Sequence, residues 1–129
     1  MNVHVINDLV YTLATSEATI AEARTLLPEL LRSGASASLL DTAVGVYRQS
    51  GETARAFQCA TQAVALLVAD VSRTDYLDIV LNAAEIAESA GNRQEAGRML
   101  EVGDRVKARE MLHDPRAIAL RRRLASTRL

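Results

Sequence analysis

The sequence predicts an all-α fold of stacked antiparallel helical hairpins that ends in a C-terminal capping helix. The chain has 129 residues, the usual size of a single domain, and we expect residues 1–129 to form one domain. It is rich in Ala, Leu, Glu and Arg, which form helices well, and aromatic residues make up only 3%. Apolar residues recur at i, i+3, i+4 and i+7, and Gly, Ser and Asp interrupt this pattern.

The first predicted hairpin spans about residues 3–34. Apolar residues at helical spacing predict its first helix over residues 3–14. The run Thr15–Glu17 offers an N-cap for a second helix, which Ser33–Gly34 closes. Pro28 lies inside this second helix and predicts a kink or a break there.

The second predicted hairpin spans about residues 36–70. The run Ser36–Ser38 caps its first helix, which ends at Ser50–Gly51. A second helix follows directly from Glu52, and its apolar stripe continues until Asp70. The short connection predicts that the two helices are antiparallel neighbours.

The third predicted hairpin spans about residues 73–112. Ser72 has Asp75 three positions later, which is a capping signal for its first helix. The run Ala90–Asn92 predicts a tight turn into the second helix, whose inward positions include Val106.

A tail helix is predicted over residues 115–128, with Asp114 as its cap and Pro115 in its first turn. Residues 114–129 hold five arginines and one acid, a charge near +4, so the rest of a chain of net charge −1 is near −5. In one interpretation this helix is the polar cap of the stack. In the other it contacts an acidic groove of its own or another copy, or an acidic partner.

The second and third hairpins are related by an offset of 40 residues. Helical pairs of this length cannot bury their apolar faces alone, so stacking is the expected way to form a core. Glycine supplies the turn between paired helices, and small residues let them approach closely. The offset aligns Ala43 with Ala83, Gly51 with Gly91, and Ala56 with Ala96.

These hairpins resemble the tetratricopeptide repeat, in which an aromatic residue and a glycine precede a series of small residues. The matching residues of the second hairpin are Tyr47–Gly51, Ala56, Ala60 and Ala63. Those of the third are Ala87–Asn92, Ala96 and Leu100. Ala87 replaces the family's aromatic residue and Gly103 its late alanine, and the period exceeds the usual 34 residues.

The resemblance implies a TPR-like superhelix in which the first helix of each pair lines a concave face. It implies a non-catalytic interaction module, an adaptor or small chaperone that binds a protein or peptide partner. The family's inward positions fall on Asp8, Thr12, Asp41, Arg48, Asp78, Asn82, Glu85 and Glu88. Five of these are acidic, so we expect a basic or amphipathic helical segment in the groove. The alternative is that these residues are only the solvated faces of surface helices.

Two narrower resemblances give alternative functions. The run Asp114–Arg116 before an amphipathic helix is similar to the C-terminal end of type III secretion chaperones for needle subunits. The run Ala84–Gly91 resembles the first helix and turn of a DNA-binding helix-turn-helix, with Arg93 and Arg98 available for phosphates. Asn92 and Gly97 depart from that motif, and a pI near 6.1 argues against nucleic acid as a partner.

We expect no enzyme, no cofactor and no metal site. Cys59 stands on an apolar stripe without a nearby histidine, so it is predicted to be a small buried residue. His4 and His113 are the only histidines, and a metal site needs more ligands. The N-terminus lacks a basic region ahead of an apolar one, so we expect a cytoplasmic protein without membrane partners. Self-association into a homo-oligomer stays open.

Overall fold

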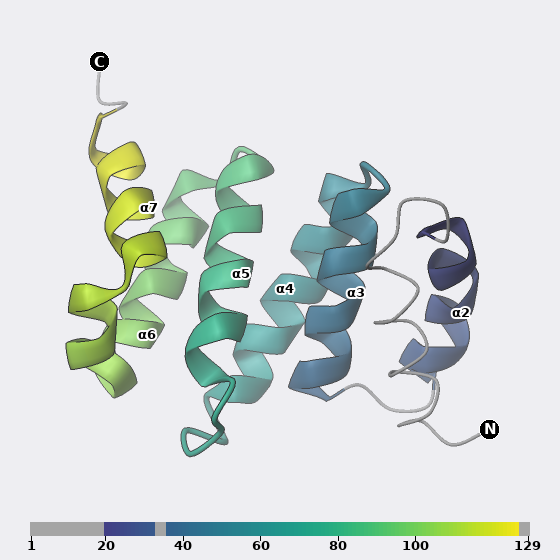
Figure 1. Ribbon diagram of the computed structural model, residues 1–129, viewed down its shortest axis with the longest axis horizontal. Helices are drawn as coiled ribbons and strands as arrows, with labels where there is room; N and C mark the ends of the chain where they lie inside the picture. Colours follow the sequence, from purple (N-terminus) through teal and green to yellow (C-terminus); the bar gives the residue numbers. More distant parts are fainter. Residues whose placement is uncertain (1–19, 33–35, 127–129) are drawn as a thin grey trace.

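The computed structural model describes residues 20–32 and 36–126, and within these ranges it contains α-helices and no strands (Figure 1). The all-α prediction is therefore confirmed. The helices are α2 (Ile20–Arg32), α3 (Ala37–Gln49), α4 (Thr53–Leu67), α5 (Tyr76–Ser89), α6 (Arg93–His113) and α7 (Pro115–Ser126). The helix predicted over residues 3–14 lies outside the described residues. No helix in the described ranges is long and apolar enough to cross a membrane.

Helices α3 and α4 form one antiparallel hairpin, and α5 and α6 form the next (Figure 1). Their turns are alike. Gly51 and Gly91 both have positive φ, +79° and +82°, which glycine adopts without strain. The backbone N–H of Glu52 donates to the carbonyl of Tyr47 at 2.8 Å, and Asn92 donates to Ala87 at 2.9 Å. Equivalent residues of the two turns are therefore 40 positions apart, as predicted.

The helices stack in two layers (Figure 1). Helices α3, α5 and α7 lie in the front layer of that view, and α4 and α6 lie behind them. Helix α5 contacts α3, α4, α6 and α7, while α2 packs on α3. The second and third predicted hairpins therefore stack on one another, and α7 lies beside α5 as α5 lies beside α3.

One apolar core runs through the stack, and it contains many small residues. Ala56 and Ala96, which follow the two turns, are both fully buried. No polar or charged residue is buried among those described. The largest fully buried side chains are Tyr76, Leu27, Leu40, Leu67, Ile79, Leu81, Ile86, Met99, Met111 and Leu120.

The structure corrects two local expectations. Helix α2 continues through Pro28, so of the predicted kink or break the break is absent, and the kink stays a prediction. Ser72 does not cap α5, because the helix begins at Tyr76 with Asp75 in the N-cap position, and the Ser72 hydroxyl instead donates to Asp70 at 3.1 Å. Asp75 precedes α5 without a capping hydrogen bond from its side chain, and its carboxylate instead binds Arg73 and Ser38. These contacts tie the turn before α5 to the start of α3.

Helix α6 is kinked at Lys107, where φ is −124° and ψ is 44°. Beyond the kink, Met111 packs on Gly103, where a Cβ atom would lie 2.9 Å from the Met111 Sδ. Val106, predicted to point inward, is 38% exposed. The helical periodicity that places Val106 inward assumes a straight helix. Helix α6 is not straight at this point, because its backbone leaves helical geometry at the next residue, Lys107.

Candidate functional site

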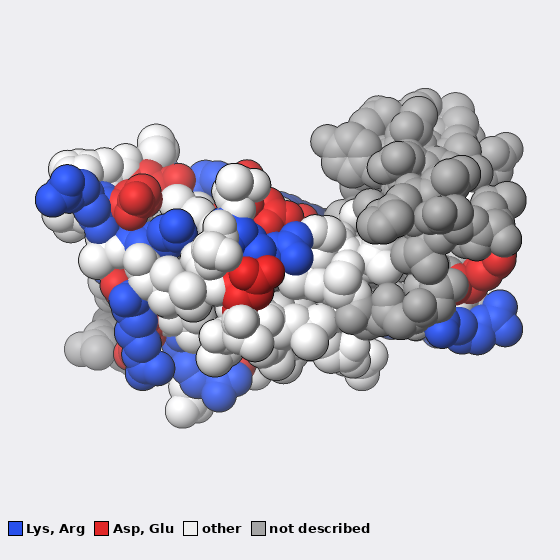
Figure 2. Space-filling model, turned by 90° about the horizontal axis from the view of Figure 1, so that it is seen from below, with Lys and Arg blue, Asp and Glu red and all other residues white. Residues whose placement is uncertain are grey.

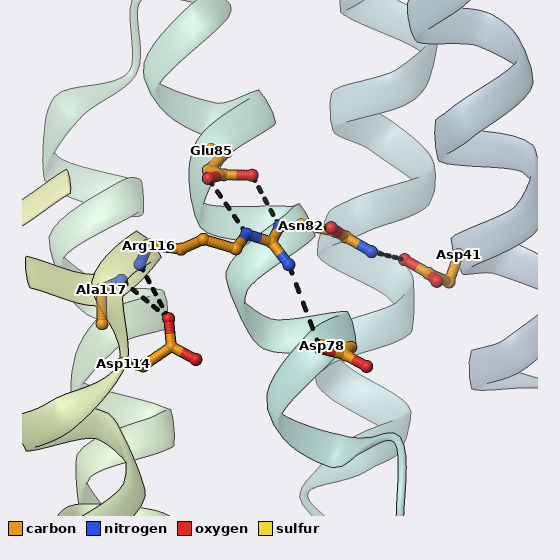
Figure 3. Close-up of polar contacts among 7 residues, drawn as sticks. All are labelled: Asp41, Asp78, Asn82, Glu85, Asp114, Arg116 and Ala117. Carbon is orange, nitrogen blue, oxygen red and sulfur yellow. Dashed lines mark hydrogen bonds and ion pairs between the residues drawn. The ribbon is translucent and has the colours of Figure 1, made fainter. Parts of the chain in front are cut away.

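Four of the predicted partner-binding residues meet where α3, α5 and the first turn of α7 come together (Figure 3). Asp41 comes from α3, whereas the other three come from α5. Together with Glu88, one turn further along α5, they form a surface that we call the acidic face. Its members are Asp41, Asp78, Asn82, Glu85 and Glu88.

Local chemistry at the start of α7 positions an arginine over this face. The Asp114 carboxylate accepts hydrogen bonds from the backbone N–H groups of Arg116, at 2.8 Å, and Ala117, at 3.3 Å (Figure 3). Pro115 occupies the first turn, where a missing N–H costs nothing. The predicted cap is confirmed, and it fixes the turn from which Arg116 reaches α5.

The Arg116 guanidinium binds the acidic face through several groups. Its Nη2 donates to the Glu85 Oε1 at 2.6 Å, and its Nε donates to Oε2 at 3.3 Å. Nη2 also donates to the side-chain oxygen of Asn82, and Nη1 lies 4.0 Å from the Asp78 Oδ1. Bidentate pairs of this kind are among the stronger ionic contacts in proteins. Glu85 is only 20% exposed, whereas Asp78 is 76% exposed.

Asn82 links Arg116 to Asp41. Its Nδ2 donates to the Asp41 Oδ1 at 3.0 Å, so the polar contacts run from α7 across α5 to α3 (Figure 3). Burial raises the pKa of the Asp41 carboxyl, and Asp75 and Asp78 act in the same direction. The Asn82 amide and Arg116 partly oppose this rise. Asp41 thus makes no ion pair with a described residue and is costly to ionise.

Asp41→Asn is expected to make the protein more stable at neutral pH. A carboxyl whose pKa is raised on folding holds its proton more tightly in the folded state, so ionising it at neutral pH costs stability. The gain should shrink as the pH falls through the folded pKa of Asp41 and vanish below the unfolded value. Urea denaturation of both proteins across this range measures the difference.

Asp75→Asn is the matched control, and its expected effect on stability at neutral pH has the opposite sign. Hydrogen bonds from Arg73 lower the pKa of Asp75, so its ionised form stabilises the folded chain. This variant should be less stable than the wild type at neutral pH, and the loss should disappear at acidic pH. An Asp41→Asn protein that is less stable at neutral pH would contradict the cost assigned to Asp41.

The remaining predicted site residues divide into three groups. Glu88 accepts hydrogen bonds from the Arg123 Nε at 2.9 and 3.0 Å, so it is engaged by α7 as well. Arg48 is exposed in the last turn of α3 and pairs with none of the described acids. Asp8 and Thr12 lie outside the described residues. The acidic face therefore comes from α3 and α5 alone in the described part of the chain.

Elsewhere on the surface the charges are mixed. In the view from the lower end of the helices, basic and acidic side chains are interspersed (Figure 2). Arg93 donates to the carbonyl oxygens of Arg123, at 3.0 Å, and Leu124, at 2.5 Å, while Arg98 pairs with Glu95. Both arginines of the helix-turn-helix alternative thus have contacts within the chain. That alternative stays a prediction, which a gel shift with duplex DNA would test.

Cys59 is buried, as predicted, and burial raises the pKa of its thiol. Its environment therefore favours the protonated form over a nucleophilic thiolate. Within residues 20–32 and 36–126, no three side chains of His, Cys, Asp or Glu converge as a metal site would require.

The acids of the site were predicted from the sequence, but the arginine that binds them was not. The positive charge of the tail was predicted, with the option that the tail contacts an acidic groove of its own chain. The structure bears out this contact and also the packing of α7 on the last hairpin. The Asp114 cap was the local signal that Arg116 would stand in the first turn.

The described residues define an all-α protein of stacked helical hairpins with a carboxylate-lined face. No protein-family model, curated protein or solved structure matches the chain.

Proposed function

We propose that this protein is a non-catalytic interaction module, an adaptor or small chaperone, that binds a basic or amphipathic helical segment on the acidic face. The observation that carries the proposal is the binding of the Arg116 guanidinium by Glu85 and Asn82. A side chain of the same chemistry on a partner helix would find the same acceptors. Helix-in-groove docking of this kind relies on a few anchors at helical spacing.

The face has capacity for more than one guanidinium. Asp78 is largely exposed, at 4.0 Å from Arg116, so a second cation can approach it. Asp41 has an amide as its hydrogen-bond partner and pairs with no described cation. A partner arginine near Asp41 would favour its ionised form, which burial disfavours. Contact with Asp41 would therefore gain more than contact with a fully solvated carboxylate.

The acids also lie on two neighbouring helices. The Asn82–Asp41 hydrogen bond joins α5 to α3, and these helices pack against one another. A bound helix that crosses this junction would meet acids from both of them. Charges of one sign on a binding surface also steer an oppositely charged partner toward it.

The triple variant Asp41→Lys, Asp78→Lys, Glu85→Lys tests the proposal. The probe is a labelled helical peptide of Ala, Leu and Arg with two arginines seven residues apart, and fluorescence anisotropy measures its affinity. Charge reversal replaces attraction by repulsion, so the affinity should fall by at least about tenfold, the equivalent of about 1.4 kcal/mol. Circular dichroism checks that the variant remains helical.

A second triple variant controls for net charge. Asp70→Lys, Glu101→Lys, Glu110→Lys reverses three exposed acids outside the acidic face. This control variant should bind the probe with the affinity of the wild type. A peptide with Glu in place of Arg should bind neither the wild type nor the control variant. Equal affinity of the probe for both triple variants would contradict the proposal.

A further inference from the structure

Helix α7 is held on the body of the protein by a small apolar contact together with charged groups. Its buried residues are Ala117 and Leu120, while α5 buries eight side chains. Three arginines of α7 form ion pairs with the other helices: Arg116 with Glu85 and Asp78, Arg121 with Asp104, and Arg123 with Glu88. Helix α7 therefore docks through two buried side chains and a set of charged contacts that its arginines supply.

These ion pairs are accessible to solvent. The side chains of Arg116, Arg121 and Arg123 are 38%, 44% and 49% exposed. Ion pairs at such sites contribute little individually and weaken as salt screens them. Arg93 adds hydrogen bonds to the last carbonyls of α7, a favourable position for a cation at a helix C-terminus.

The side of α7 that faces the body has the pattern expected of a partner helix. Arg116 and Arg123 are seven residues apart, which places them on one side of a helix, and they bind Glu85 and Glu88. Ala117, Leu120 and Leu124 form an apolar stripe beside them. Helix α7 therefore occupies the α5 half of the acidic face, whereas Asp41 makes no ion pair with a described residue.

We infer that α7 is a built-in competitor for the acidic face, and that an arginine-bearing amphipathic helix binds there by displacing it. This inference rests on the proposed function, since it concerns the regulation of the same surface. Asp114 alone separates α6 from α7, so α7 is present at a high effective concentration. The apparent affinity of a partner is reduced by the fraction of time for which α7 covers the face.

The double variant Arg116→Ala, Arg123→Ala of the full chain tests the inference. It removes both arginines that bind α5 and leaves the acidic face intact. The probe is a labelled peptide with the sequence of residues 114–126, the one segment that this face is seen to hold. The variant should bind the probe at least about tenfold tighter than the wild type, because α7 competes less well.

A variant with Arg122→Ala and Arg105→Ala controls for the loss of two positive charges. Both residues are exposed, and neither forms an ion pair with a described residue. This control should bind the probe with the affinity of the wild type. Tight binding by the control as well would overturn the inference, because net charge alone would then explain the gain.

Hydrogen exchange of the wild-type chain gives a second readout that needs no substitution. Addition of the probe should speed exchange in residues 115–126 and leave α5 protected. Equal affinity in wild type and double variant, with unchanged exchange in α7, would overturn the inference and keep the proposed function. If neither the wild type nor the double variant binds this probe or the Ala/Leu/Arg peptide, the proposed function itself is wrong.

Discussion

Leu81→Ala is expected to lower the free energy of unfolding by about 2–5 kcal/mol, the usual cost of truncating a buried leucine to alanine. Leu81 is fully buried in α5, the helix that contacts α3, α4, α6 and α7. The cavity would therefore open at the centre of the stack, where neighbouring helices leave little room for collapse. Because the total free energy of unfolding of a small domain is only about 5–15 kcal/mol, this loss would be a large share of the stability of the protein.

Urea denaturation measures the change, and Leu66→Ala is the matched control. Leu66 lies in α4 and is 43% exposed, so the same truncation there should cost much less. A Leu81→Ala protein as stable as the Leu66→Ala protein would show that α5 is not the central element of the core.

Ala56→Leu is expected to destabilise the protein by about 1–3 kcal/mol, in this case by overpacking. Ala56 is fully buried in the first turn of α4, where a small residue lets the helix lie close to α3. A leucine would have to push the paired helices apart or adopt an unfavourable rotamer. Thermal unfolding followed by circular dichroism would report the loss as a lower Tm.

Ala54→Leu, two residues earlier in the same helix, separates packing from helix propensity. Ala54 is exposed, and leucine is nearly as good a helix former as alanine, so its Tm should stay close to that of the wild type. Equal effects of the two substitutions would contradict the close approach of α3 and α4.

The helices whose ends are set by local chemistry were predicted well from sequence. Ser36 caps α3, and its side chain accepts a hydrogen bond from the Leu39 N–H at 3.2 Å. Gly51 and Gly91 end their helices through positive φ, and Asp114 caps α7. In each case the residues that decide the structure are within a few positions of one another.

Expectations failed where a distant contact decides the outcome. Asp75 was predicted to complete a capping signal with Ser72, yet it binds Arg73 and the Ser38 hydroxyl across 37 positions. The kink at Lys107 accompanies the packing of Met111 on Gly103. The contact of Asp75 with Ser38 has no signature in a short window of sequence, because it depends on how α5 lies against α3. Gly103 and Met111 lie in one helix, but an unbroken helical period does not predict the kink between them.

In the candidate site, too, some residues could be predicted from the sequence and others depend on a distant contact. The acids on α3 and α5 were expected from the resemblance to the tetratricopeptide repeat, and the structure brings three of them, Asp41, Asp78 and Glu85, together around Asn82 and Arg116. That Arg116 binds Glu85, 31 positions away, could not be predicted, because several arginines of the tail were equivalent in sequence. Only the orientation of α7 on α5 distinguishes them.

The contact between Gly103 and Met111 has an evolutionary consequence. A Cβ atom at position 103 would lie 2.9 Å from the sulfur of Met111 and 3.3 Å from a methyl group of Val80, so the two positions share one volume. A larger residue at 103 requires a smaller or reoriented one at 111. Across the descendants of this sequence, these two positions should therefore change together, although eight residues and a kink separate them.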